Sequence, residues 1–212
     1  MEKKNRKERE KQQRKADIID AGEKIFNQHG FEGASMDAIA KEAEFTKRTV
    51  YQYFPNKEDL FFAVVARSYS KLRLYLEEAA SRGKNGKEKL HLCLDGYKRF
   101  YDDDPGRFFL MNQVGDVRKS AEITENFLNW TDSVKSLFMQ NEKYVSEGIE
   151  DGSLKNLTDR KMTSSVTTFM LTSVFSFFSQ TGENFIKHMD LDKELFLNEC
   201  LNVISSYIET SQ

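Results

Sequence analysis

Residues 35–61 read SMDAIAKEAEFTKRTVYQYFPNKEDLF, and the two halves of this stretch have different patterns. In the first half, apolar side chains recur at the spacing of one face of an amphipathic helix. In the second half, residues 46–54 place threonine, lysine, arginine, glutamine and tyrosine around Val50 and Phe54. A protein core does not need so many hydrogen-bond donors on one short helix. The stretch therefore predicts a polar partner for the outer face of this helix.

The residues around this stretch predict three consecutive helices. The first covers about residues 12–28, and Gly30 closes it because glycine readily adopts the left-handed conformation that ends helices. Ser35 is a suitable N-cap for the second helix, and Thr46 can cap a third that runs to about Phe54. Two short helices joined by a tight turn, the second rich in outward donors, indicate a helix-turn-helix motif.

The second helix of such a motif fits the DNA major groove, which is about 12 Å wide, and its first turn meets the base edges. Lys57 opens a fourth helix, where its ammonium group is expected to hold a DNA phosphate. The candidate DNA-contacting residues are Ser35, Thr46, Lys47, Arg48, Thr49, Tyr51, Gln52, Tyr53 and Lys57.

The charge distribution agrees with an anionic partner at the N-terminal end. Residues 1–57 carry 13 Lys and Arg against 10 Asp and Glu, whereas the remaining residues carry 19 against 24. A basic module on an acidic body is typical of nucleic-acid binding, and a merely solvated charged tail is the alternative. We expect the arm MEKKNRKEREKQQRK to lie along the duplex.

The composition favours an all-α fold. The chain has 212 residues, only two prolines, and no strand-length alternation of β-branched and polar residues. No run of about 18 apolar residues predicts a membrane span, and the charged N-terminus lacks the apolar stretch of a secretory signal. The expected location is cytoplasmic. Cys93 and Cys200 each fall in an apolar helical pattern and are interpreted as reduced core thiols.

The stretch GFEGASMDAIAKEAEFTKRTVYQYFPNKEDLF resembles the N-terminal domain of the TetR family of transcriptional regulators. The resemblance covers about residues 14–62 and rests on Gly-Phe before the turn, on Ile39-Ala40, and on Tyr51-x-Tyr53-Phe54. One position departs from the family pattern, because Glu44 stands where a glycine is usual at the middle of the turn. Glutamate must then accept the turn conformation or shift it slightly.

The resemblance implies homodimers with a variable C-terminal region of helices that pairs the subunits and encloses a small-molecule pocket. Effector binding then alters the separation of the two heads and releases an inverted-repeat operator in double-stranded DNA. The expected organisation is a basic arm at 1–11, a helix-turn-helix domain at 12–60 with its motif at about 35–54, and a helical effector-binding and dimerisation domain at 61–212.

The segment TSSVTTFMLTSVFSFFSQ, residues 163–180, is apolar or small nearly all round, so its helix is expected to be buried on several sides. Together with the last helix it is a candidate four-helix dimer interface, and a plain core role for both helices is the alternative. The candidate interface residues are Phe169, Val174, Phe177, Phe178, Leu197, Leu201, Ile204 and Ile208.

Aromatic and methionine side chains on the middle helices are candidates for lining an effector pocket, although such stripes also occur in ordinary packing. They are Tyr97, Phe100, Tyr101, Phe108, Met111, Asn112, Trp130, Val134, Phe138 and Met170. The effector itself cannot be read from these residues. The three histidines have no metal-ligand spacing, so no metal or cofactor is expected.

Other functions are less consistent with the sequence. It contains no Gly-rich phosphate loop, nucleophile elbow or HExxH motif, so an enzyme is not expected. An effector-independent DNA binder of the same fold, an activator and a helical protein-interaction module remain alternatives. Repression is the expected direction of regulation, because it is the commoner behaviour in the family that the chain resembles.

Overall fold

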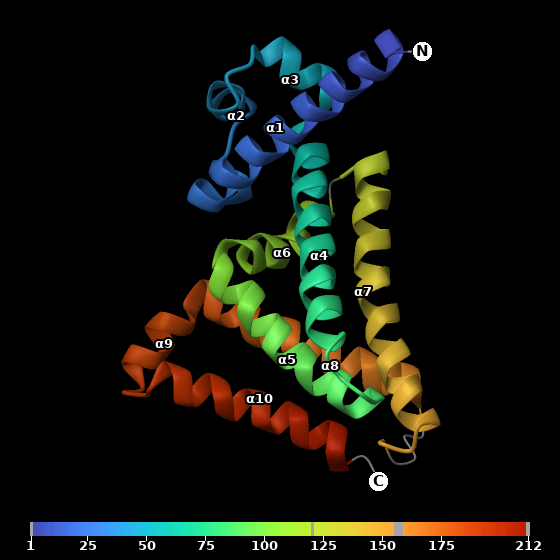
Figure 1. Cartoon of the computed structure of the whole chain (residues 1–212). Coiled ribbons are helices and arrows are strands. Elements are labelled where there is room, and N and C mark those ends of the chain that lie inside the picture. The colour runs from blue at the N-terminus through green and yellow to red at the C-terminus, as the bar shows by residue number, and fades with distance from the viewer. Residues whose placement is uncertain (1, 120, 155–158, 211–212) are drawn as a thin grey trace. The chain divides into compact units, whose positions relative to one another are not determined.

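The computed structural model describes residues 2–119, 121–154 and 159–210, with side chains from residue 6 to residue 207 within these ranges. The described residues form helices and no strand, which confirms the all-α prediction (Figure 1). They divide into two compact units. The first contains residues up to Arg67 and the segment Asn112–Thr131, and the second contains Ser68–Met111 and the residues from Asp132 onward.

The first unit is built from the N-terminal helices and from parts of three longer ones. Its complete helices are α1 (Glu2–Gly33), α2 (Met36–Glu42) and α3 (Lys47–Tyr53), followed by the first part of α4 (Lys57–Ala80). The C-terminal end of α6 (Pro105–Val117) and the start of α7 (Glu125–Glu150) complete it.

Helix α1 begins earlier than predicted and breaks at the predicted glycine. It begins at Glu2 instead of residue 12, so the expected arm 1–11 is helical over its described residues. Side-chain bonds four residues apart, such as Arg6 to Glu10 at 3.0 Å, support this charged part of the helix. At Gly30 the backbone is not helical, with φ +68° and ψ 176°, so the helix breaks there and a short helical piece follows to Gly33.

The core of the first unit joins α1, the helix-turn-helix motif and the start of α4. Its fully buried side chains include Ile18, Phe26, Ile39, Val50, Phe54, Leu60 and Phe61. A Cβ at Gly22 would lie 3.3 Å from the Leu60 side chain, so the absence of a side chain there lets α1 and α4 approach closely. Arg67 of α4 forms ion pairs with Asp20 and Glu23 of α1.

Side-chain hydrogen bonds attach the segment 112–131 to the rest of the first unit. The backbone N–H of Phe31 donates to Oε1 of Gln113 at 2.9 Å. The amide of Asn126 donates to a carboxylate oxygen of Asp59 at 2.8 Å, and both side chains are buried. The Trp130 ring packs at a tilt against the Phe62 ring, with centroids 5.3 Å apart, and adds an apolar contact.

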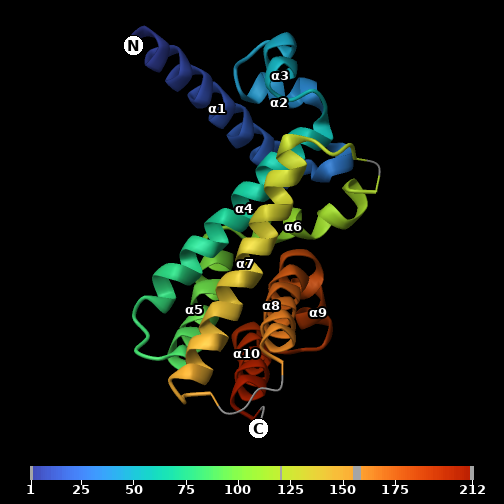
Figure 2. The same ribbon diagram turned by 90° about the vertical axis from the view of Figure 1, so that its right-hand side faces the viewer.

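The second unit consists of the remaining helices. Its elements are the rest of α4, α5 (Gly86–Asp103), the first part of α6, the rest of α7, α8 (Arg160–Phe177), a π-helical turn η1 (Phe178–Gly182), α9 (Glu183–His188) and α10 (Lys193–Thr210). The sequence predicts one helix through residues 163–180, and in the structure α8 gives way to η1 at Phe178. Helices α8 and α10 lie side by side (Figure 2).

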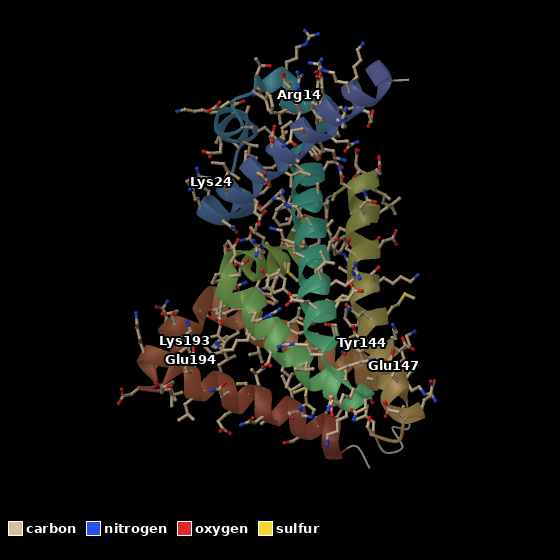
Figure 3. The ribbon with its side chains drawn as sticks, viewed as in Figure 1. Arg14, Lys24, Tyr144, Glu147, Lys193 and Glu194 are labelled. Atoms are coloured by element: carbon tan, nitrogen blue, oxygen red, sulfur yellow. The ribbon has the colours of Figure 1, made fainter. Side chains whose placement is uncertain are left out.

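Aromatic side chains form the centre of the second unit. The rings of Tyr97, Tyr101 and Phe108 gather around Phe175 of α8, with the Phe108 and Phe175 centroids 5.4 Å apart. Ion pairs connect its outer parts, namely Lys89 with Glu147 at 2.5 Å and Lys193 with Glu183 at 2.6 Å (Glu147 and Lys193 are labelled in Figure 3).

Helix α8 buries hydroxyl groups as well as rings. Thr167 and Thr168 donate to the carbonyl oxygens four residues earlier, at Thr163 and Ser164, so their hydroxyl groups are satisfied within the helix. Asn141 of α7 donates to the Thr168 hydroxyl at 2.8 Å. None of the helices described here combines the length and hydropathy required to cross a membrane.

Candidate DNA-binding surface

Both helices of the motif begin at a side-chain cap, as the sequence predicted. Ser35 Oγ accepts a hydrogen bond from the Ala38 N–H at 3.2 Å, and Thr46 Oγ1 accepts one from the Thr49 N–H at 3.1 Å. These bonds satisfy backbone donors at the helix ends and fix where each helix starts. The caps therefore set the position of the first turn of α3.

The turn between α2 and α3 contains a residue in the left-handed conformation. Glu44 has φ +57°, which a residue with a side chain rarely adopts. The N–H of Phe45 donates to the Ala40 carbonyl at 2.9 Å and closes the turn. Glu44 thus accepts the conformation that the sequence required at this position.

Helix α3 has one buried and one exposed face. Val50 is fully buried, as is Phe54, which follows the helix. Lys47, Arg48, Tyr51 and Gln52 are exposed, as is the capping residue Thr46, and Thr49 and Tyr53 are half-buried. This arrangement leaves ammonium, guanidinium, phenol and amide donors on the outer face of a short, capped helix.

Lys47 has a carboxylate partner on the preceding helix. Its ammonium nitrogen lies 2.7 Å from Oδ1 of Asp37, in the first turn of α2. The hydrogen bond to Asp37 is the main reason why the pKa of Lys47 is raised above its ordinary value. The same ammonium group lies 6.0 Å from the centre of the Tyr51 ring. Lys47 is therefore charged and already paired on the surface of the motif.

Lys57 has acceptors within the first unit, and its contact with a DNA phosphate stays a prediction. Its ammonium group donates to the carbonyl oxygens of Phe31 at 2.7 Å and Ala34 at 3.1 Å, and lies 4.3 Å from the centre of the Phe31 ring. These carbonyls belong to the chain that leaves α1. Lys57 therefore joins the start of α4 to the end of α1.

Replacing Lys57 by alanine should lower the stability of the first unit by about 2 kcal/mol, because two carbonyl groups lose a charged donor. Urea denaturation followed by circular dichroism measures this loss. Lys41→Ala, at an exposed position on α2, is the control and should change the midpoint little. If Lys57→Ala keeps its stability but loses affinity equally for every DNA sequence, Lys57 contacts a DNA phosphate.

The model of the family described as "Bacterial regulatory proteins, tetR family" matches residues 18–64, which span the helices and turn described above. The chain belongs to the TetR family. It is a DNA-binding transcriptional regulator, and the recognition helix of this TetR-family motif is α3.

Relatives and solved structures agree with this assignment. The HTH-type transcriptional regulator YhgD of Bacillus subtilis (strain 168) is 26% identical over 190 residues, which cover 85% of this chain and 89% of that protein. The fatty acid metabolism regulator protein of the same organism is 26% identical over 153 residues, covering 68% and 73%. The structure of FadR from Bacillus subtilis in complex with stearoyl-CoA has a TM-score of 0.69 at 20% identity, covering 91% of this chain and 98% of that one.

In this TetR-family chain the predicted pocket residues are distributed over both units. Asn112 and Trp130 belong to the first unit. Tyr97, Phe100, Tyr101 and Phe108 are buried against one another and against Phe175, so they fill the interior of the second unit. Met111 is also buried, whereas Val134, Phe138 and Met170 are half-buried. As effector contacts, these residues stay a prediction.

Surface hollows that the sequence did not indicate lie on the second unit. One of about 610 Å³ is lined by Arg82, Asn85, Lys87, Glu88, His91 and Leu92. Another, of about 380 Å³, lies between α5 and α10, where the Ser205 hydroxyl is 3.2 Å from Nδ1 of His91. Both linings mix polar side chains with leucines, Leu92 in each and Leu94 and Leu201 in the second, and no sequence motif brings these residues together.

The predicted dimer-interface residues also separate into two groups. Phe178, Leu197 and Ile204 are at most 3% exposed and are core residues of the second unit, which corrects their assignment. Phe169 and Phe177 are exposed, Val174 and Leu201 are half-buried, and the Ile208 side chain lies outside the described residues. Within the described ranges no group of three or more potential metal ligands comes together.

Proposed function

We propose that this regulator is a repressor that binds an inverted-repeat operator as a homodimer and leaves it when a small molecule binds the second unit. The observation that carries the proposal is the outer face of α3, where exposed donors stand on a helix whose start is fixed by the Thr46 cap. Such a face matches the hydrogen-bonding pattern of the major groove. Because the target is the chromosome, we place the protein in the cytoplasm.

Dimerisation supplies the affinity that one recognition helix lacks, since a single helix reads only a few base pairs. Helices α8 and α10 offer apolar side chains that the second unit leaves exposed. Met162 and Phe169, seven residues apart, lie on one face of α8, and Leu195 and Val203 lie on one face of α10. We define these four residues as the α8–α10 patch and propose that it pairs with its copy in a second chain.

Selection of bound genomic fragments by the full-length protein tests the DNA-binding function. The expected result is a set of fragments that share an inverted repeat, with half-sites about one helical turn or a multiple of it apart. Transcription from the adjacent promoter should rise when the gene for this protein is deleted. Fragments without a shared sequence would contradict sequence-specific regulation, and falling transcription would show activation.

For the effector, we propose an acyl-coenzyme A thioester. The support is the likeness to the fatty acid metabolism regulator protein and to the FadR structure, which holds stearoyl-CoA. On this chain, Arg82 and Lys87 line the larger hollow and supply positive charge of the kind that the phosphates of coenzyme A require.

Acyl-CoA thioesters with chains of two to eighteen carbons should be tested in a melting assay and in an operator-binding assay. At a hundred times its dissociation constant, a ligand that binds only the folded state stabilises it by about 2.7 kcal/mol. We expect one range of chain lengths to raise the melting temperature and to release the operator. Free coenzyme A and free fatty acids are the controls. If no thioester has either effect, the effector belongs to another chemical class.

A further inference from the structure

Asp37 is an acidic residue on a surface that is expected to meet a polyanion. It stands in the first turn of α2, and its carboxylate contacts the ammonium group of Lys47 in the first turn of α3 at 2.7 Å. Both side chains are largely exposed, 66% for Asp37 and 57% for Lys47. Exposed pairs of this kind contribute little to folding stability. The Asp37–Lys47 ion pair is therefore not explained by a contribution to the stability of the motif.

The pair alters the charge that α3 offers to DNA. Helix α3 carries two cationic side chains, Lys47 and Arg48. The carboxylate of Asp37 neutralises the charge of Lys47. Attraction to DNA that does not depend on sequence arises from lysine and arginine charges that replace counterions at phosphates. A lysine that is already paired contributes less to this attraction, so the free protein binds arbitrary DNA more weakly.

A base edge can replace the carboxylate only where it offers a suitable acceptor. Lysine binds guanine through O6 and N7, which lie together in the major groove. An operator with such a base opposite Lys47 compensates for the lost ion pair with short, directed hydrogen bonds. A sequence without it leaves the ammonium group on Asp37, so Lys47 then adds little to binding.

We propose that Asp37 is a specificity-determining residue, which acts by holding Lys47 in an ion pair that only an operator base replaces. This inference rests on the proposed binding of a specific operator by α3. Asp37 lowers the affinity for all DNA, and it lowers the affinity for random DNA more than the affinity for the operator. It works as a positioning residue through Lys47 and does not itself contact a base.

The test compares the wild-type protein with Asp37→Asn on an operator duplex and on a random duplex of equal length over a range of salt concentrations. We expect Asp37→Asn to bind random DNA about twofold to fivefold more tightly per head, the equivalent of one exposed ion pair. Its salt dependence on random DNA should steepen by roughly one unit per head, because Lys47 then replaces a counterion. The operator should gain less, so the ratio of the two affinities falls.

Glu42→Gln is the matched control. Glu42 lies at the other end of α2 and pairs with Lys24 of α1 at 2.5 Å (Lys24 is labelled in Figure 3), so this variant removes the same charge and breaks an exposed pair away from α3. Its affinity ratio should equal that of the wild type. An equal fall of the affinity ratio in both variants would show that net charge alone causes the effect, and would overturn the proposal. An unchanged or higher ratio in Asp37→Asn would also overturn it.

A second comparison shows whether Asp37 acts through Lys47. In a Lys47→Ala background, Asp37→Asn should change neither affinity nor salt dependence, and a persisting effect would show direct repulsion of phosphates and overturn the proposal. Circular dichroism melting verifies that the variants fold, and Asp37→Ser replaces Asp37→Asn if the latter does not. A wild-type protein that fails to distinguish operator from random DNA refutes the proposed function, whereas discrimination that Asp37→Asn leaves intact refutes only this inference.

Discussion

Phe169→Asp should give a monomer that binds its operator about 10²- to 10⁴-fold more weakly than the wild-type protein. The side chain of Phe169 is 69% exposed in the single chain, so a carboxylate there is solvated and the chain still folds. In a dimer that buries the α8–α10 patch, the same carboxylate would be desolvated beside apolar groups. The affinity falls because the second head no longer binds as an intramolecular event.

Sedimentation equilibrium and operator titration measure both effects. The wild-type protein should have about twice the chain mass of 24.7 kDa, and the variant should have the mass of one chain with an unchanged circular dichroism spectrum. Met139→Asp is the control, because Met139 is 59% exposed on α7 and lies outside the α8–α10 patch. If Phe169→Asp stays dimeric and binds the operator normally, the subunits pair through another surface.

Gly86→Ala should destabilise the second unit by about 3 kcal/mol or more. A Cβ at Gly86 would lie 2.0 Å from the backbone nitrogen of Gly148 and 2.6 Å from the carbonyl oxygen of Tyr144. These are backbone atoms of α7, so no side chain can rotate to make room, and α5 must move away from α7. Displacements of this kind are at the upper end of the usual cost of overpacking.

Urea and thermal denaturation measure the change, with Gly115→Ala as the control. A Cβ at Gly115 meets no atom within 4 Å, and alanine is the better helix former, so this variant should gain about 0.5–1 kcal/mol. Equal stability of Gly86→Ala and the wild-type protein would mean that the start of α5 lies farther from α7 than in this structure.

The helix-turn-helix could be predicted from the sequence because its signals are local. A cap such as Ser35 or Thr46 bonds to a backbone N–H only three residues away, so neither depends on the rest of the fold. The buried face of α3 follows from the positions of Val50 and Phe54 alone. The partner of Lys47 could not be predicted, because Asp37 reaches it from another helix.

Interior and interface could not be separated from the sequence in the second unit. A stripe of aromatic residues such as Tyr97 and Phe108 reads the same whether it lines a cavity or packs on Phe175, and the structure shows packing. Similarly, Leu197 and Ile204 form the strongest apolar stripe of α10, and that stripe is buried within the unit. The exposed apolar residues lie on a weaker stripe, which hydrophobic spacing alone did not select.

The partners of charged side chains that lie far apart in the chain could not be predicted from the sequence either. Lys57 stands at the start of a helix in a motif that binds DNA, so its sequence position suggested a phosphate contact. Its acceptors, the carbonyls of Phe31 and Ala34, lie more than 20 residues earlier. The charged start of α1 was missed because its residues lack apolar periodicity, although most of them are good helix formers and make bonds four residues apart.

The left-handed Glu44 has a consequence in terms of mutation. That backbone conformation costs a residue with a Cβ atom roughly 1–2 kcal/mol, and glycine adopts it without that cost. Glutamate and glycine codons differ by a single base in their second position. A single nucleotide substitution that changes Glu44 to glycine would therefore stabilise the turn between α2 and α3. A change to valine or isoleucine at the same position would add strain, since β-branched residues are the least suited to positive φ.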